Sequence, residues 1–185
     1  MAMNESAQKL QSIELSAGVP RALALERIRT VLEKDLGYQF SEIDETRPWG
    51  AFYRIVDEQA DRFVSEFFPG LDPLAARLGH KELRLSPKIL IVYPGQRLSW
   101  QYHGYRAERW RFLTPGGYHK SLTDDQGTAQ TAAADDTVQF ETGERHRLVG
   151  SADGYTLVAE IWQHTDPSHP SEESDIVRLA DDYKR

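Results

Sequence analysis

The stretch that decides the fold reads Gly95-Gln-Arg-Leu-Ser-Trp-Gln101-Tyr-His103-Gly-Tyr-Arg-Ala-Glu108, and His146 follows Glu108 by 38 residues. Side chains on a β-strand alternate between its two faces, so Gln101 and His103 point to the same side. After a turn, Glu108 can face that side from the next strand, and His146 can reach it from a strand pairing alongside. The spacing therefore predicts a small antiparallel barrel that brings an amide, two imidazoles and a carboxylate onto one metal ion.

These four ligands would form a mixed nitrogen and oxygen site. Such a set suits Zn, Mn, Fe(II), Co or Ni, and donor softness does not choose among them; zinc is our first expectation. The same residue types also occur on a solvated or structural hairpin, because short motifs match by chance. Two turn signals favour the metal site, namely Pro94-Gly95 before the strand and Glu141-Thr-Gly143-Glu-Arg-His146 at the last ligand.

Composition excludes several classes of protein. The chain has 185 residues, a formal net charge of −7 and no cysteine, so we expect no disulfide and no cysteine-based zinc site. The acidic balance argues against nucleic acid as a partner, since phosphate binding needs a basic surface. We read no signal peptide and no apolar run long enough for a membrane helix. The expectation is a cytoplasmic protein without a membrane partner.

The pattern along the chain is mainly β and follows an N-terminal helical part. We expect an arm over residues 1–46, polar and mobile over residues 1–18, with a helix over Pro20–Lys34. A barrel over residues 47–185 then carries a helical insertion at about residues 58–80 and a C-terminal tail. Short segments separated by turn signals indicate a sandwich or barrel. The expected strands are Ala51–Val56, Lys88–Tyr93, Gln96–His103, Glu108–Leu113, Tyr118–Leu122, Thr137–Phe140, His146–Val149 and Thr156–Gln163.

The insertion carries an apolar stripe that includes Phe63 and Phe67. Such periodicity usually marks a face packed against a core. The stripe is expected to pack against the barrel or against a second subunit, and a homodimer is the expected assembly.

Six motifs occur in order along the chain: Arg47-Pro-Trp-Gly50, Lys88 with Pro94-Gly-Gln-Arg-Leu-Ser99, Gln101-x-His103, Arg106-Ala-Glu-Arg-Trp110, His146-Arg-Leu148 and Asp175-Ile-Val-Arg-Leu-Ala-Asp-Asp-Tyr183. These motifs resemble those of the cupin domain of type II mannose-6-phosphate isomerases. The resemblance covers residues 47–185 and implies a cupin fold, a double-stranded β-helix or jelly-roll barrel. The chain departs from the family at Gly104-Tyr105 and at Arg109, where the family has histidines, and at Glu58–Pro87, which replaces a short hairpin.

The resemblance implies a metal-dependent aldose–ketose isomerase, an intramolecular oxidoreductase that acts on a sugar or sugar phosphate. A mannose-6-phosphate isomerase-like or a D-lyxose/mannose isomerase-like activity would proceed through a metal-stabilised enediolate. A general base must move the proton between two carbons; Lys88 and Glu160 are the candidates. Arg97 shares strand parity with Gln101 and His103, so we expect it in the same cavity, binding the enediolate or a phosphate.

Further residues are candidates for holding the substrate. Arg106 and Arg109 are placed near the mouth of the barrel, and each could instead form a salt bridge with one of the 29 acidic residues. Trp49 could stack on a sugar ring, or simply pack at a barrel end. Arg178 is expected to pin the tail across the barrel, near the pocket.

Two other functions remain open. A non-catalytic sugar-binding metal cupin fits the missing family histidines at positions 105 and 109. An Fe(II) dioxygenase cupin would also use an open metal site, but Gln101 stands where such enzymes carry a histidine.

Overall fold

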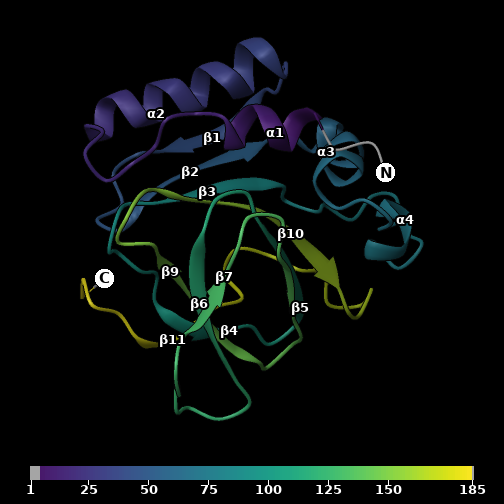
Figure 1. Ribbon diagram of the computed structural model, residues 1–185. Coiled ribbons are helices and arrows are strands. Elements are labelled where there is room, and N and C mark those ends of the chain that lie inside the picture. Colours follow the sequence, from purple (N-terminus) through teal and green to yellow (C-terminus); the bar gives the residue numbers. More distant parts are fainter. Residues whose placement is uncertain (1–4, 185) are drawn as a thin grey trace.

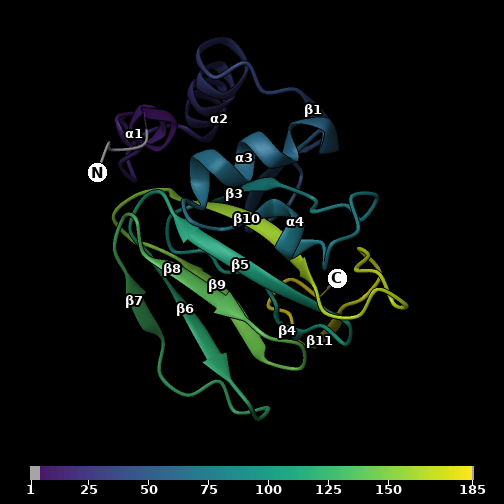
Figure 2. The same ribbon diagram turned by 90° about the vertical axis from the view of Figure 1, so that its right-hand side faces the viewer.

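The computed structural model describes residues 5–184; residues 1–4 of the predicted arm and residue 185 of the predicted tail lie outside the described residues. Two antiparallel sheets face each other and form a barrel (Figures 1 and 2). The larger sheet has the order β1-β2-β3-β10-β5-β8, and the smaller has the order β11-β4-β9-β6-β7. The strands are β1 (Phe40–Asp44), β2 (Gly50–Ile55), β3 (Lys88–Val92), β4 (Trp100–Tyr102), β5 (Arg106–Phe112), β6 (Gly116–Ser121), β7 (Gln130–Ala132), β8 (Thr137–Phe140), β9 (Arg145–Gly150), β10 (Thr156–His164) and β11 (Val177–Ala180).

Helices cover the outer face of the larger sheet, on the side away from the smaller sheet (Figures 1 and 2). Among the described residues, none of these helices is long and apolar enough to cross a membrane. The helical segments are α1 (Glu5–Gln11), α2 (Arg21–Thr30), the π-helical turn η1 (Val31–Asp35), the 3₁₀ turn η2 (Asp57–Gln59), α3 (Ala60–Phe67) and α4 (Pro73–Ala76).

Strand β3 contributes side chains to two hydrophobic cores, one on each of its faces. All five of its residues are buried, as expected for a strand that is covered on both faces. Ile89 and Ile91 belong to the cluster under the helices, whereas Leu90 and Val92 belong to the cluster inside the barrel. The alternation of strand side chains thus joins the helical layer to the barrel wall.

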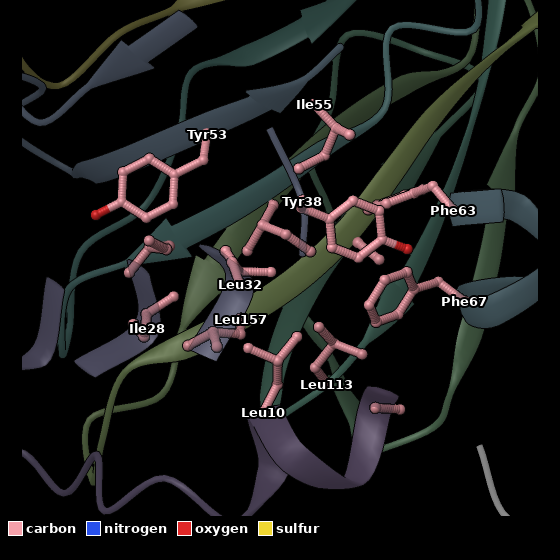
Figure 3. Packing of buried hydrophobic residues seen from close by; sticks show 14 of the residues in the cluster. Leu10, Ile28, Leu32, Tyr38, Tyr53, Ile55, Phe63, Phe67, Leu113 and Leu157 are labelled. Carbon is pink, nitrogen blue, oxygen red and sulfur yellow. The ribbon is translucent and has the colours of Figure 1, made fainter. Parts of the chain in front are cut away.

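The insertion packs inside its own chain. Phe63 and Phe67 of α3 are fully buried and lie against Tyr38, with ring centroids 5.9 and 6.2 Å apart (Figure 3). The Phe63/Phe67 stripe therefore leaves no apolar area for a second subunit. The homodimer stays a prediction without that support.

Three expectations about local structure need correction. Residues 5–11 form helix α1 rather than a mobile arm, because Leu10 is fully buried in the helical cluster (Figure 3). The predicted strand Gln96–His103 shortens to β4, because the segment before it makes only an isolated bridge, between Arg97 and Val149. The tail contains β11, which pairs with β4. The helix expected over Pro20–Lys34 is confirmed as α2 and η1.

Candidate metal centre

Three buried side chains converge inside the barrel. His103 follows β4, Glu108 lies on β5 and His146 lies on β9, and one donor atom from each lies within 4.8 Å of the others. His103 Nε2 is 3.0 Å from Glu108 Oε1, and His146 Nε2 is 3.3 Å from Glu108 Oε2. Each residue is at most 2% exposed. Two imidazoles and a carboxylate at this spacing form a group that can hold a divalent ion.

Two polar atoms of this group lack a hydrogen bond. Glu108 Oε2 and His146 Nε2 are buried and have no hydrogen-bond partner of acceptable geometry among residues 5–184, although they face each other. Burying such groups without a partner costs free energy. A divalent cation between these donors would satisfy both atoms, so the residues present fit a metal ion.

The backbone orients both imidazole rings. His103 Nδ1 lies 2.6 Å from the carbonyl oxygen of Asp175, and His146 Nδ1 lies 3.0 Å from that of Glu144. A carbonyl oxygen only accepts, so Nδ1 must carry the proton in each ring. In the neutral rings Nε2 then offers its lone pair to the site, the arrangement that metal-binding histidines commonly show.

Gln101 is the predicted fourth ligand. It is the direct cross-strand partner of His146 and lines the same cavity as Glu108. Its Oε1 accepts a hydrogen bond of 2.6 Å from Ser99 Oγ. Gln101 is thus close to the group, and its role as a ligand stays a prediction.

Arg106 balances the charge of Glu108. Its Nε and Nη2 atoms lie 3.0 and 2.9 Å from Glu108 Oε1, and its Nη1 donates to the carbonyl of Glu172 at 2.6 Å. Burial alone would raise the pKa of the Glu108 carboxyl, but its electrostatic interactions with His103 and with the Arg106 guanidinium hold that pKa well below its usual range. Glu108 is therefore an ionised carboxylate, the form that binds a cation.

A cavity of about 390 Å³ opens beside Glu108. It lies between the two sheets, where the interior side chains of β3, β5 and β10 meet those of β4 and β11. A larger hollow of about 750 Å³ adjoins it but contains none of the predicted ligands, so the smaller cavity is the candidate site. The smaller cavity is lined by Glu42, Arg47, Trp49, Phe52, Arg54, Lys88, Leu90, Leu98, Ser99, Gln101, Arg106, Glu108, Glu160, Glu173, Ile176 and Arg178.

Glu160 is a second buried carboxyl in this wall. Its Oε2 accepts a 2.9 Å hydrogen bond from Trp110 Nε1, and its Oε1 lies 3.6 Å from Lys88 Nζ. Burial, followed by the charge of Glu108, raises the pKa of Glu160 to about 7. Glu160 and Lys88 are cross-strand partners on β10 and β3, and both line the cavity that Glu108 lines.

Trp49 and Arg178 also line the cavity, but two other predicted residues do not. Arg97 lies before the short strand β4 and pairs with Asp182 at 2.5 Å, so the strand parity used to place it inside does not apply. Arg109 neighbours Glu108 on β5 and faces the other side, where it donates to Gln139 and Gln163. Neither arginine lines the cavity in which we expected it.

Sequence reasoning missed three residues. Arg54 lines the cavity from β2, and Glu173 closes part of its wall. Asp175 contacts the turn after His103, with its carboxylate accepting from the backbone nitrogens of Gly104, Tyr105 and Arg106 at 2.7–3.1 Å. Asp175 opens the closing motif of the chain, which is a signal that could have drawn attention to it.

Comparison with known proteins supports the architecture. No protein-family model matches the chain, and no curated protein matches it. Among solved structures, the capsular polysaccharide assembling protein CapF from Staphylococcus aureus is similar, with a TM-score of 0.50 and 14% identity over 87% of this chain and 42% of that chain. The fold is a cupin double-stranded β-helix.

Two smaller structures are also similar. A predicted oxalate decarboxylase from Thermotoga maritima has a TM-score of 0.45 and 16% identity, covering 69% of this chain and 98% of that chain. A Cupin 2 conserved barrel domain protein from Salinispora arenicola has a TM-score of 0.37 and 21% identity, covering 43% and 62%. At such identities the similarity concerns the fold alone. The chain spans less than half the length of CapF.

Proposed function

We propose that this cupin is a metal-dependent aldose–ketose isomerase that acts on a sugar or sugar phosphate. One observation carries the proposal: the buried carboxyl of Glu160, which is not part of the metal group, lines the same cavity as Glu108. Isomerisation moves a proton between two neighbouring carbons. A carboxyl with a pKa of about 7 can both take and return that proton at neutral pH.

His103, Glu108 and His146, with Gln101 as a fourth donor, would hold the ion. The bound ion would supply Lewis-acid chemistry, polarising a substrate carbonyl and stabilising negative charge on oxygen. Zinc remains the first expectation for its identity, with Mn, Fe, Co and Ni as the others.

The other residues of the cavity would bind and orient the sugar. Trp49 offers an aromatic face. Arg178 extends from β11 and its guanidinium makes no hydrogen bond or ion pair within the described residues, so it is free to bind substrate oxygens. Lys88, the other candidate base, lies 3.6 Å from Glu160 Oε1. The motifs shared in order with type II mannose-6-phosphate isomerases also support this class of reaction.

A second candidate is a metal cupin that binds a sugar without turnover. It is favoured by the pairing of the cavity's charged groups with each other, since Arg106 holds Glu108 and Lys88 holds Glu173. An Fe(II) dioxygenase is a weaker third candidate, because Gln101 takes the place of a histidine.

Metal analysis of the purified protein followed by an aldose/ketose panel tests the proposal. We expect turnover that a chelator abolishes, without oxygen uptake. His103→Ala should lose both metal and turnover, whereas His80→Ala, at an exposed loop position, should keep both. Glu160→Gln should keep the metal and lose turnover. Sugar binding without turnover would support the second candidate, and oxygen uptake the third.

A further inference from the structure

Glu173 reaches into the cavity wall from the segment between β10 and β11. Its Oε1 lies 2.6 Å from Lys88 Nζ and 2.8 Å from Arg54 Nη2. Lys88 Nζ is 3.6 Å from Glu160 Oε1. The ammonium group therefore lies between two carboxylates and is closer to the one that comes from the distant segment.

The strand pairing alone would favour an ion pair between Lys88 and Glu160. Lys88 and Glu160 are direct partners across β3 and β10, and both are 6% exposed. Glu173 is 45% exposed and lies at the edge of the cavity. It gains a second cation, Arg54, and keeps part of its hydration. A carboxylate with two cationic donors and access to water is the more favourable partner for the ammonium.

We propose that Glu173 is a positioning residue that holds the Lys88 ammonium away from Glu160 and so leaves the Glu160 carboxyl free to accept a proton. The inference deepens the proposed isomerase function and rests on it for its catalytic meaning. The contact between Glu173 and Lys88 is present in the folded chain whatever reaction the protein catalyses. Glu173 acts through Lys88 and need not touch the substrate.

The charged groups around Glu160 indicate that loss of the Glu173 charge lowers the pKa of Glu160. Lys88 faces it from β3, Arg106 and Glu108 face it from β5, and Glu173 faces it from the segment after β10. The negative charges raise the pKa of Glu160 and the positive charges lower it. Loss of the Glu173 charge removes one repulsion and also frees Lys88 to approach, so both effects strengthen the ionised form.

Titration of the Glu160 carboxyl tests the inference without reference to turnover. Protein labelled with ¹³C at the glutamate carboxyl is titrated by NMR, and the resonance is assigned with Glu160→Gln. We expect Glu173→Gln to move the Glu160 midpoint from about 7 toward 4.5. The matched control is Glu172→Gln, which removes the same charge one residue away, from a side chain that does not contact Lys88. It should leave the midpoint in place. An unchanged or higher midpoint in Glu173→Gln overturns the inference.

A double-mutant comparison shows whether the effect passes through Lys88. We expect the shift caused by Glu173→Gln to be larger with Lys88 present than in Lys88→Gln. Equal shifts in both backgrounds would mean that Glu173 acts only as a distant charge, and would overturn the positioning role.

The titration is run on metal-free protein and on protein loaded with diamagnetic Zn²⁺. Failure to take up metal or to turn over sugars defeats the proposed function, while the shift in the metal-free protein still decides the role of Glu173. In an active enzyme, the acidic limb of the kcat profile should move to lower pH in Glu173→Gln, and Glu173→Asp should restore part of the original profile.

Discussion

The Nδ1 atom of His103 lies 2.6 Å from the backbone carbonyl oxygen of Asp175, a residue 72 positions further along the chain. The Asp175 carboxylate also accepts from three backbone nitrogens of the turn after His103. One residue of the C-terminal segment thus holds both the ring and the turn that carries it. The metal group depends on this segment as much as on the barrel strands.

Asp175→Ala should therefore weaken metal binding. The variant keeps the backbone carbonyl that accepts from His103 but removes the carboxylate that holds the turn after His103. Loss of an outer partner that positions a ligand typically costs about 10–100-fold in metal affinity, and we expect a decrease of up to that size. Competition with a chromogenic chelator measures it. Asp166→Ala is the control, because that carboxylate holds a separate turn at Ser168. Equal affinities in the wild type and Asp175→Ala would contradict the assignment.

The buried carboxyl of Glu160 should make stability depend on pH. Its pKa in the folded protein, about 7, lies above the ordinary value of 4.5. The folded state binds the proton more tightly, so this contribution to stability is present below pH 4.5 and lost as the pH rises through 7. Glu160→Gln keeps an acceptor for Trp110 and removes the charge.

Metal-free Glu160→Gln should accordingly gain stability over the wild type as the pH rises. The difference between the folded and ordinary pKa values corresponds to a gain in the free energy of unfolding of at most about 3 kcal/mol in alkaline solution. Urea unfolding of both proteins from pH 5 to pH 8.5 measures the difference. Glu26→Gln, at an exposed position on α2, should show a difference that does not vary in this way. A flat difference for Glu160→Gln would show that the carboxyl titrates normally.

Arg178 and Arg97 should differ in their effect on substrate binding because of where they lie. Arg178 lines the cavity, whereas Arg97 pairs with Asp182 outside it. Arg178→Ala should raise KM by about 10–100-fold, the range for a lost hydrogen bond to a charged group. Arg97→Ala should leave KM unchanged. Steady-state kinetics on the sugar that the panel identifies test the pair, and the reverse ranking would refute our placement of the substrate.

Helix α1 should contribute to stability although it is remote from the metal group. Leu10→Ala removes a fully buried side chain and should lower the free energy of unfolding by about 2–5 kcal/mol. Metal stoichiometry should not change. Leu122→Ala, at a side chain that is 76% exposed, is the matched control. Denaturant unfolding that finds both variants equally stable would mean that α1 does not pack as described.

The metal group could be predicted because its signals are local. Gln101 and His103 share a face through simple alternation, and His146 is the direct partner of Gln101 across two strands. Glu108 faces the same interior from β5. Alternation would also have excluded Arg109, which neighbours Glu108 and must face the opposite side.

The remaining features depend on contacts between distant segments. Arg97 was misplaced because parity holds only within one continuous strand, and β4 begins after it. Glu173 meets Lys88 across 85 residues of chain, a contact that no spacing rule predicts. The polar character of residues 1–18 concealed the few apolar positions, such as Leu10, that α1 buries.

The position of Asp175 in the chain affects how the protein matures. A polypeptide emerging from the ribosome presents His103 and Glu108 first, then His146, and only later the carbonyl that orients the first imidazole. Until Asp175 has been synthesised, the His103 ring lacks the carbonyl that orients it. The metal group can therefore reach its described geometry only once the C-terminal segment is in place.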